Sequence, residues 1–159
     1  MKTLYIMRHP QKSTSNVKED NFDLKLSEHG IEQTHEMGER LRQMNIQPDL
    51  IVASPANRTR TTAEIMALEL KYNKTIMYNE VLYQAFLNEL IETITYTFDT
   101  VNELLLIGHN PSLTALVLTL VGHKDEVKPG SVLKIEFHTD SWINIAKENA
   151  HLIWLEEVN

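Results

Sequence analysis

Short apolar runs alternate with longer amphipathic stretches along the whole chain. The apolar runs are bounded by polar or turn-forming residues, as is typical of buried strands, and the stretches between them have helical spacing. The expected strands are residues 3–7, 50–53, 75–78, 104–107, 131–138 and 151–155. Residues 10–26 are mostly polar and are predicted to form a long loop.

The first helix is expected to begin after Ser27, whose hydroxyl can cap the free N–H groups of the first turn. It should run to about residue 44. Its inward-facing side chains are expected to be Ile31, Met37, Leu41 and Met44.

Three further segments have helical patterns. A helix after Ser54-Pro55 has apolar residues at i, i+3, i+4 and i+7, and a later one has a similar stripe. These stripes are Ala63, Met66, Ala67 and Leu70, and then Leu87, Leu90, Ile91, Ile94 and Phe98. Residues 112–121 are apolar nearly all round, which predicts a buried helix, and Pro111 suits its first position.

The alternation of strands and helices predicts the α/β class, with a mostly parallel sheet covered on both faces. We therefore expect a three-layer α/β/α sandwich. A chain of 159 residues fits one domain, so residues 1–159 are expected to fold together.

Composition and charge exclude several classes of protein. With 42% hydrophobic and 23% charged residues, the chain is neither disordered nor fibrous. A net charge of −7 argues against a general nucleic-acid or anionic-membrane binder. The absence of cysteine excludes disulfides, thiolate nucleophiles and cysteine metal sites. No signal peptide or membrane-spanning run is apparent, so the expected location is the cytoplasm.

Unusual polar residues follow three of the predicted strands, at Arg8-His9, at residues 54–60 and at residues 108–110. Ligands of parallel sheets bind at the carboxyl ends of strands, so these residues are expected to meet. Arg8, His9, His109 and one arginine of the middle segment would form a pocket for a dianionic phosphoryl group. An arginine can pair two phosphate oxygens at once.

The two histidines suit different steps of phosphoryl transfer. A neutral imidazole can attack phosphorus and form a phosphohistidine that water later hydrolyses. Its other nitrogen must carry a proton and donate it, often to a backbone carbonyl. The second imidazole, when cationic, can stabilise the equatorial oxygens, and the helix after Pro111 adds its N-terminal N–H groups.

Three motifs resemble those of the histidine phosphatase superfamily, whose fold is that of phosphoglycerate mutase. They are LYIMRHP, LIVASPANRTRTTAEI and ELLLIGHNPSL, in that order along the chain. The short length, the Ser-Pro-Ala start of the second motif and the Leu-Tyr-Gln-Ala run at 82–85 are similar to the SixA-type bacterial phosphohistidine phosphatases.

This resemblance implies that His9 is the nucleophile and that Arg8, Arg58 and His109 complete the phosphate pocket, with no cofactor or metal. Arg58 holds the family position. Arg60 cannot share the role, because residues two apart on a helix point about 200° apart. Arg60 is therefore expected to be a solvated charge.

Two positions depart from the family pattern. Pro10 replaces the usual glycine or alanine after the nucleophile, and it has no N–H to offer a ligand. Thr59 replaces an alanine, a change that we expect to be tolerated.

The general acid is the least certain part of the site. Glu80 follows the third strand, and Glu19, Asp20 and Asp23 lie in the long loop, but for each of them a solvated surface carboxylate is the favoured interpretation. A leaving imidazole needs less protonation than a leaving alkoxide. A missing acid would therefore favour phosphohistidine as the substrate.

The function expected from this resemblance is removal of phosphate from phosphohistidine on a signalling or phosphotransfer protein, releasing inorganic phosphate. One alternative is a small-molecule phosphomonoesterase that uses Glu80 as its acid. Another is a module that binds phosphate or phosphoproteins without turnover. A metal held by His9 and His109 is disfavoured, because the flanking arginines repel a cation. The other five histidines are expected to be surface or core residues: His29, His35, His123, His138 and His151.

Overall fold

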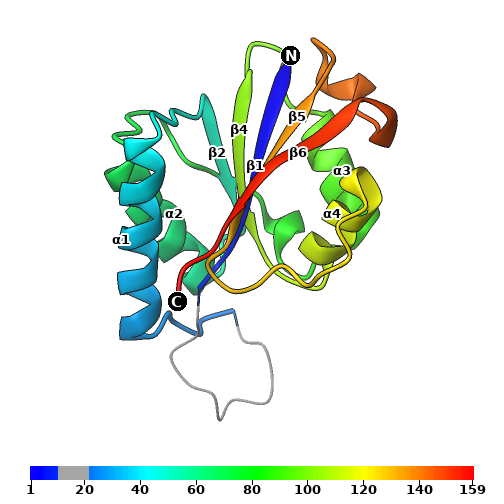
Figure 1. Ribbon diagram of the computed structural model, residues 1–159. Helices are drawn as coiled ribbons and strands as arrows, with labels where there is room; N and C mark the ends of the chain where they lie inside the picture. The colour runs from blue at the N-terminus through cyan, green and yellow to red at the C-terminus, as the bar shows by residue number, and fades with distance from the viewer. Residues whose placement is uncertain (11–21) are drawn as a thin grey trace.

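The computed structural model describes residues 1–10 and 22–159, and its centre is one six-stranded sheet (Figure 1). The order across the sheet is β3-β2-β4-β1-β5-β6. The first four of these are parallel to one another, whereas β5 is antiparallel to both of its neighbours, β1 and β6. The predicted mostly parallel α/β sheet is therefore confirmed. The strands are β1 (Lys2–Arg8), β2 (Leu50–Ala53), β3 (Met77–Tyr78), β4 (Glu103–Gly108), β5 (Val132–Phe137) and β6 (Ala150–Glu156).

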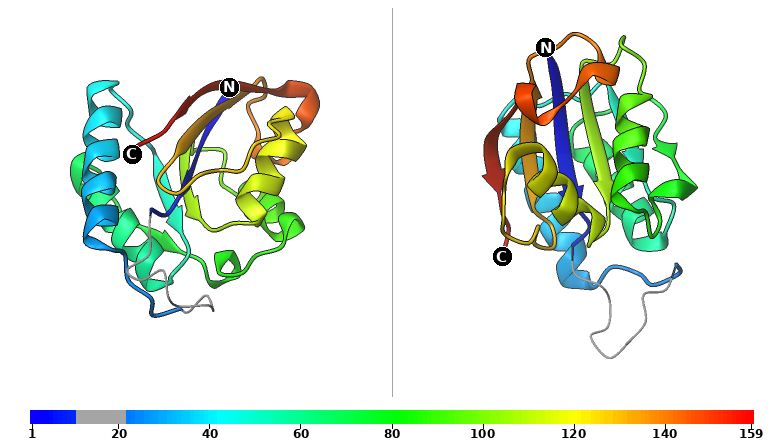
Figure 2. Two further views of the ribbon diagram at one scale, coloured as in Figure 1. Left: turned by 60° about the horizontal axis from the view of Figure 1, so that its bottom comes forward. Right: turned by 90° about the vertical axis from the view of Figure 1, so that its right-hand side faces the viewer.

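Helices cover both faces of this sheet (Figures 1 and 2). One face carries α1 (Glu28–Gln43) and α2 (Asn57–Glu69), and the other carries α3 (Leu87–Thr95) and α4 (Ser112–Val121). This is the expected three-layer sandwich. No helix within the described ranges is long and apolar enough to cross a membrane.

Two apolar clusters join the layers, one on each face of the sheet. Strand β1 contributes to both, because alternate side chains of a strand point to opposite faces. Leu4 and Ile6 pack with the cluster under α3 and α4, and Tyr5 and Met7 pack with the cluster under α1 and α2. Both faces of this central strand are therefore buried, as its continuous apolar run predicted.

Helix α1 begins as expected, since the Ser27 hydroxyl accepts a 2.9 Å hydrogen bond from the Gly30 N–H. Met37 and Leu41 face the core, but the prediction was wrong for Ile31 and Met44, which are 37% and 39% exposed. Met44 lies beyond the last helical turn, and the buried stripe of α1 passes through Gly30 rather than Ile31.

The buried stripe of α1 is unusual because it contains two glycines and two polar residues. At Gly38, a Cβ atom would lie 2.5 Å from the Cβ of Glu69 on α2. The two helices therefore approach closely enough that only glycine fits there. Small residues on this face made the stripe harder to find by hydrophobicity alone.

The expected inward position of Phe98 was also wrong. Helix α3 ends at Thr95, and the Phe98 side chain is 80% exposed. Pro111 is the residue before α4 rather than its first helical residue. Strand β3 is shorter than predicted, and most of the expected loop 10–26 lies outside the described residues.

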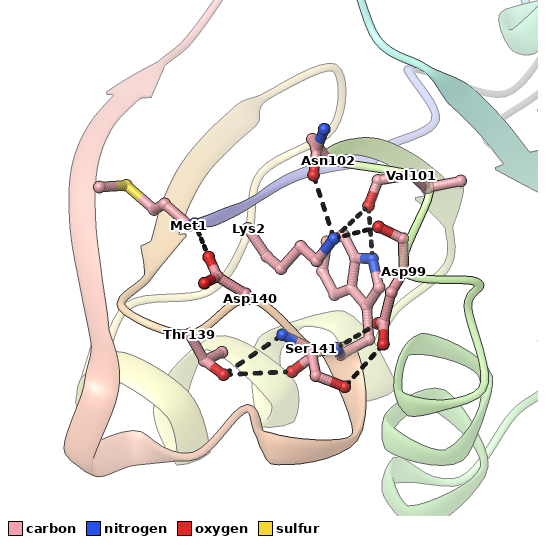
Figure 3. A network of polar contacts seen from close by, with 9 residues as sticks. Met1, Lys2, Asp99, Val101, Asn102, Thr139, Asp140 and Ser141 are labelled. Atoms are coloured by element: carbon pink, nitrogen blue, oxygen red, sulfur yellow. Dashed lines mark hydrogen bonds and ion pairs between the residues drawn. The ribbon is translucent and has the colours of Figure 1, made fainter.

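A buried lysine joins the start of β1 to the connection between α3 and β4 (Figure 3). Lys2 is 2% exposed, and its Nζ lies 5.9 Å from the centre of the Trp142 ring. The ammonium donates to the carbonyl oxygens of Asp99 (2.6 Å) and Val101 (3.0 Å) and to Oδ1 of Asn102 (3.1 Å). A lysine ammonium has three protons, so these three acceptors match its donors.

Candidate active site

Three neighbouring strands, β2, β4 and β1, end at the same edge of the sheet. Arg8 is the pairing partner of Gly108, so the residues that follow them, His9 and His109, emerge side by side. Their ring centres are 5.2 Å apart. The register of two strands thus brings together two histidines that are far apart in the sequence.

The His9 side chain is buried and its tautomer follows from its contacts. Nδ1 lies 2.7 Å from the carbonyl oxygen of Pro10, which can only accept, so Nδ1 carries the proton. Nε2 then has a free lone pair, which accepts a 3.3 Å hydrogen bond from Nε of Arg58. Pro10 therefore supplies the carbonyl that orients the ring, although it has no N–H.

The pKa of His9 is lowered to about 3. Burial is the largest cause, because it penalises the charged ring, and the neighbouring His109 is the next. The guanidiniums of Arg58 and Arg8 act in the same direction, whereas the hydrogen bond to Pro10 opposes them. His9 is therefore neutral near pH 7, the state that a nucleophilic imidazole requires.

Arg58 is fully buried and links the two histidines. It is the second residue of α2, and its Nη2 donates to Nδ1 of His109 at 3.3 Å. Since Nδ1 accepts, Nε2 of a neutral His109 carries the proton and donates to the hydroxyl of Ser54 at 2.8 Å. Ser54 is thus a site residue that the sequence analysis treated only as part of a motif.

Thr59, one of the two residues that depart from the expected motif, stabilises the turn between β2 and α2. The Thr59 hydroxyl donates to the carbonyl oxygens of Ser54 (2.7 Å) and Ala56 (3.0 Å). A buried hydroxyl is costly only when it lacks such partners. The threonine therefore fits this position and helps to fix Ser54.

Arg8 approaches the site from the opposite side. Its Nη1 donates to the carbonyl oxygen of Val127 at 2.8 Å and to Oε1 of Glu126 at 3.3 Å. The same carbonyl accepts a 2.9 Å hydrogen bond from Nδ2 of Asn110. Arg8 is therefore attached to the connection between α4 and β5, residues 122–131.

Two aromatic rings continue the row of imidazoles toward the surface. Tyr83 packs edge-on against His109 with ring centres 5.7 Å apart, and Phe22 packs edge-on against Tyr83 at 5.2 Å. Phe22 is exposed, and its carbonyl oxygen accepts from the N–H of Asn57 at the start of α2. Neither ring was predicted as a site residue, because the contacts of Phe22 with Tyr83 and of Tyr83 with His109 join distant parts of the chain.

Arg60 and Glu80 are exposed, unlike the buried His9, Arg58 and His109. Arg60 is exposed, and its guanidinium lies 4.0 Å from the centre of the Tyr78 ring. Glu80 is exposed at the start of a 3₁₀ turn, Glu80–Leu82, and within residues 1–10 and 22–159 its carboxylate has no hydrogen bond or ion pair. Asp23 is exposed as well, and Glu19 and Asp20 lie outside the described residues.

The remaining histidines lie elsewhere in the fold. His35 contacts Glu69 at 2.8 Å, and the rings of His138 and His151 are 4.7 Å apart on the β5–β6 side. Across the part of the chain that the structure describes, no group of three or more His, Asp or Glu side chains could hold a metal ion.

Two imidazoles and two guanidiniums thus converge at one end of the sheet. Helices α2 and α4 also begin here, since Arg58 lies in the first turn of α2 and α4 starts three residues after His109. Free N–H groups and the helix dipole make such ends favourable for anions. The arrangement fits a tetrahedral oxyanion with a neutral nucleophilic nitrogen beside it.

The sequence profile described as "Histidine phosphatase superfamily (branch 1)" matches residues 4–94, more than half of the chain. The matched region includes Arg8, His9 and Arg58, and His109 lies beyond it. No curated protein sequence is significantly similar to this chain.

Solved structures share the fold over nearly the whole length. The structure named as phosphohistidine phosphatase SixA of Nakamurella multipartitia has a TM-score of 0.84 at 20% identity, covering 98% of this chain and 95% of that one. The protein histidine phosphatase SixA in complex with tungstate gives 0.80 at 18%, covering 96% and 95%. A mycobacterial glucosyl-3-phosphoglycerate phosphatase with inorganic phosphate gives 0.68 at 15%, covering 96% and 95%. Identities this low show a common fold.

Proposed function

This chain belongs to the histidine phosphatase superfamily, and we propose that it is a phosphatase that hydrolyses phosphohistidine on a protein, with His9 as the nucleophile. The observation that carries the proposal is the state of the His9 ring. Its Nδ1 proton is held by the Pro10 carbonyl, and its Nε2 lone pair faces Arg58 in a cluster with His109.

In the first step, the Nε2 lone pair attacks phosphorus, a bond forms between Nε2 and phosphorus, and the bond from phosphorus to the substrate's imidazole breaks. The leaving imidazole ends with a proton from solvent. Arg58 moves its donors from the two histidines to the phosphoryl oxygens, which frees the lone pair. Arg8 neutralises charge from the other side.

In the second step, water attacks the phosphorus carried on His9. The bond between Nε2 and phosphorus breaks, the water loses one proton, and inorganic phosphate leaves. The His9 ring regains its neutral state, with its Nδ1 proton still bound to Pro10. No redox or metal chemistry is required by this balance.

The leaving group is inferred from what surrounds the cluster. Glu80, the acid candidate after β3, is exposed in the 3₁₀ turn Glu80–Leu82, whereas His9 and His109 are buried, which favours a leaving group that departs without a strong acid. Tyr83 beside His109, with Phe22 packed against Tyr83, offers an aromatic wall that suits an imidazole.

Small phosphate esters are the second candidate substrates. The backbone N–H of Tyr83 donates to the carbonyl oxygen of Glu80 at 3.1 Å, so one turn carries both the aromatic wall and this carboxylate. Glu80 could then serve an ester by protonating its alkoxide, if the side chain turns toward the pocket. The fold is also shared with a sugar phosphoglycerate phosphatase.

The test is phosphate release from a histidine-phosphorylated carrier protein, with EDTA present and p-nitrophenyl phosphate assayed alongside. Faster release from the carrier, unchanged by EDTA and by Glu80→Gln, would support the proposal. Preference for the ester and loss of its hydrolysis in Glu80→Gln would favour the small-molecule phosphatase. Tight phosphate binding with no release from either compound would indicate a binding module instead.

A further inference from the structure

A carboxylate lies at the edge of the phosphate pocket, on the side of Arg8. Glu126 Oε1 is 3.3 Å from Nη1 of Arg8, and it comes from the connection between α4 and β5. The Glu126 side chain is 69% exposed, whereas that of Arg8 is 18% exposed. The Glu126 carboxylate therefore lies on the solvent side of the Arg8 guanidinium.

The backbone beside Glu126 is tightly fixed. Val127 is buried, its N–H donates to the Thr114 hydroxyl at 3.0 Å, and its carbonyl oxygen accepts from both Arg8 and Asn110. The Asn110 side-chain oxygen in turn accepts from the N–H and hydroxyl of Thr114. Glu126 is thus held beside the site by the same residues that position Arg8.

The charged neighbours of Glu126 in this connection are Lys124, Asp125 and Lys128, all exposed. Lys128, two residues further on, directs its ammonium toward Glu157 at 3.6 Å. Asp125, the residue before Glu126, is a second exposed carboxylate. A leaving group that passes this edge with its own negative charge would meet like charge.

We propose that Glu126 selects substrates by charge: it disfavours phosphate compounds whose leaving group is anionic and favours those whose leaving group is neutral or cationic. The inference rests on the proposed function, because the imidazole of phosphohistidine is such a leaving group. In this proposal the guanidiniums of Arg8 and Arg58 bind the phosphoryl group. Repulsion by Glu126 therefore acts on a second anionic group of the substrate. In a partly solvated pocket, the expected discrimination is ~3- to 10-fold at low ionic strength.

The test uses two ligands that differ mainly in that charge, 3-phosphoglycerate with its carboxylate and glycerol 3-phosphate with a hydroxyl in its place. Their dissociation constants are measured by calorimetry at low and high salt, which requires no turnover. In Glu126→Gln, the affinity for 3-phosphoglycerate should rise ~3- to 10-fold more than that for glycerol 3-phosphate. The difference between the two affinity changes should shrink at about 0.5 M salt, because the electrostatic screening length there is on the order of a few ångströms.

Asp125→Asn is the matched control, since it removes the same charge one residue away and leaves Arg8 with its partner. It should change the ratio of the two affinities by less than about twofold. Equal effects of the two variants, or an unchanged ratio in Glu126→Gln, would overturn the role of Glu126. Thermal unfolding of both variants verifies that the exposed substitutions leave the fold intact.

This outcome is separable from that of the proposed function. If Glu126→Gln changes the ratio of the two affinities as expected but the wild-type protein releases no phosphate from the carrier, the pocket selects by charge and the proposed function is wrong. If the carrier is dephosphorylated and the ratio does not shift, the proposed function stands and the role of Glu126 is wrong.

Discussion

Arg58 donates a hydrogen bond from Nε to Nε2 of His9 across 3.3 Å. The arginine thus covers the lone pair that nucleophilic attack needs. An incoming phosphoryl group offers the guanidinium a dianion in place of a neutral nitrogen, and a charge-assisted pair is the stronger of the two. Binding of the phosphoryl group and release of the nucleophile are therefore one event.

Replacing the nucleophile should abolish turnover while leaving binding largely intact. We expect His9→Ala to lower kcat by at least ~10³-fold, because the variant lacks the Nε2 lone pair that attacks phosphorus. Affinity for inorganic phosphate should change by less than about tenfold, since both guanidiniums remain. Phosphate release and calorimetry measure the two quantities, and turnover retained in His9→Ala would remove the nucleophile assignment.

The two arginines of α2 provide a matched pair. Arg58→Lys should reduce kcat/KM about 10²-fold, because lysine cannot reach both histidines or pair two phosphate oxygens with a planar fork. Arg60→Lys makes the same change at the exposed residue over Tyr78 and should alter the rate by less than about twofold. Similar losses in both variants would contradict the assignment of the pocket arginine.

The lowered pKa of His9 predicts a particular dependence of stability on pH. Between the ordinary value of 6.5 and about 3, the unfolded chain binds a proton at this ring that the folded chain does not. The free energy of unfolding should therefore fall as the pH falls below 6.5, by ~1.4 kcal/mol per pH unit from this group. Above pH 6.5 the contribution of His9 is constant.

Urea unfolding of the wild type and His9→Gln at pH 7, 6 and 5 isolates this contribution. The other six histidines are present in both proteins, so the difference between the two pH profiles is the readout for His9. The wild type should lose ~2 kcal/mol more than the variant between pH 7 and pH 5. Parallel pH profiles would mean that His9 is not held neutral in the folded protein.

The buried lysine of β1 is expected to matter for stability and not for chemistry. Lys2→Met should lower the free energy of unfolding by ~2–4 kcal/mol, because the carbonyl oxygens of Asp99 and Val101 lose their charged donor. Lys128→Met, at an exposed surface position, should cost less than about 0.5 kcal/mol. Phosphohistidine hydrolysis by folded Lys2→Met should be unchanged, since this network lies at the amino end of β1.

The parts of the fold that depend on local pattern could be predicted from the sequence. The strands ending at Met7, Ala53 and Ile107 were predicted because their apolar runs are continuous and their ends are polar. The rule that parallel strands end at one edge then predicted that His9 and His109 would meet. These inferences require only neighbours in the sequence.

Contacts between distant residues could not be predicted in this way. Nothing near Lys2 in the sequence indicates that its acceptors lie about a hundred residues further on. The same holds for Glu126 beside Arg8 and for Tyr83 beside His109. Ile31 was misassigned because the face of α1 that packs against α2 is selected by small size, at Gly30 and Gly38, rather than by hydrophobicity.

The strand order has a consequence for synthesis of the protein. His9 follows β1 and Arg58 follows β2, but β4 lies between these strands in the sheet and is made last of the three. A nascent chain that has emerged only as far as α3 contains His9 and Arg58 but still lacks β4, the strand that separates β1 from β2 in the sheet. Capture of phosphate by the growing polypeptide should therefore begin only after residues 103–109 have left the ribosome and inserted between the two earlier strands.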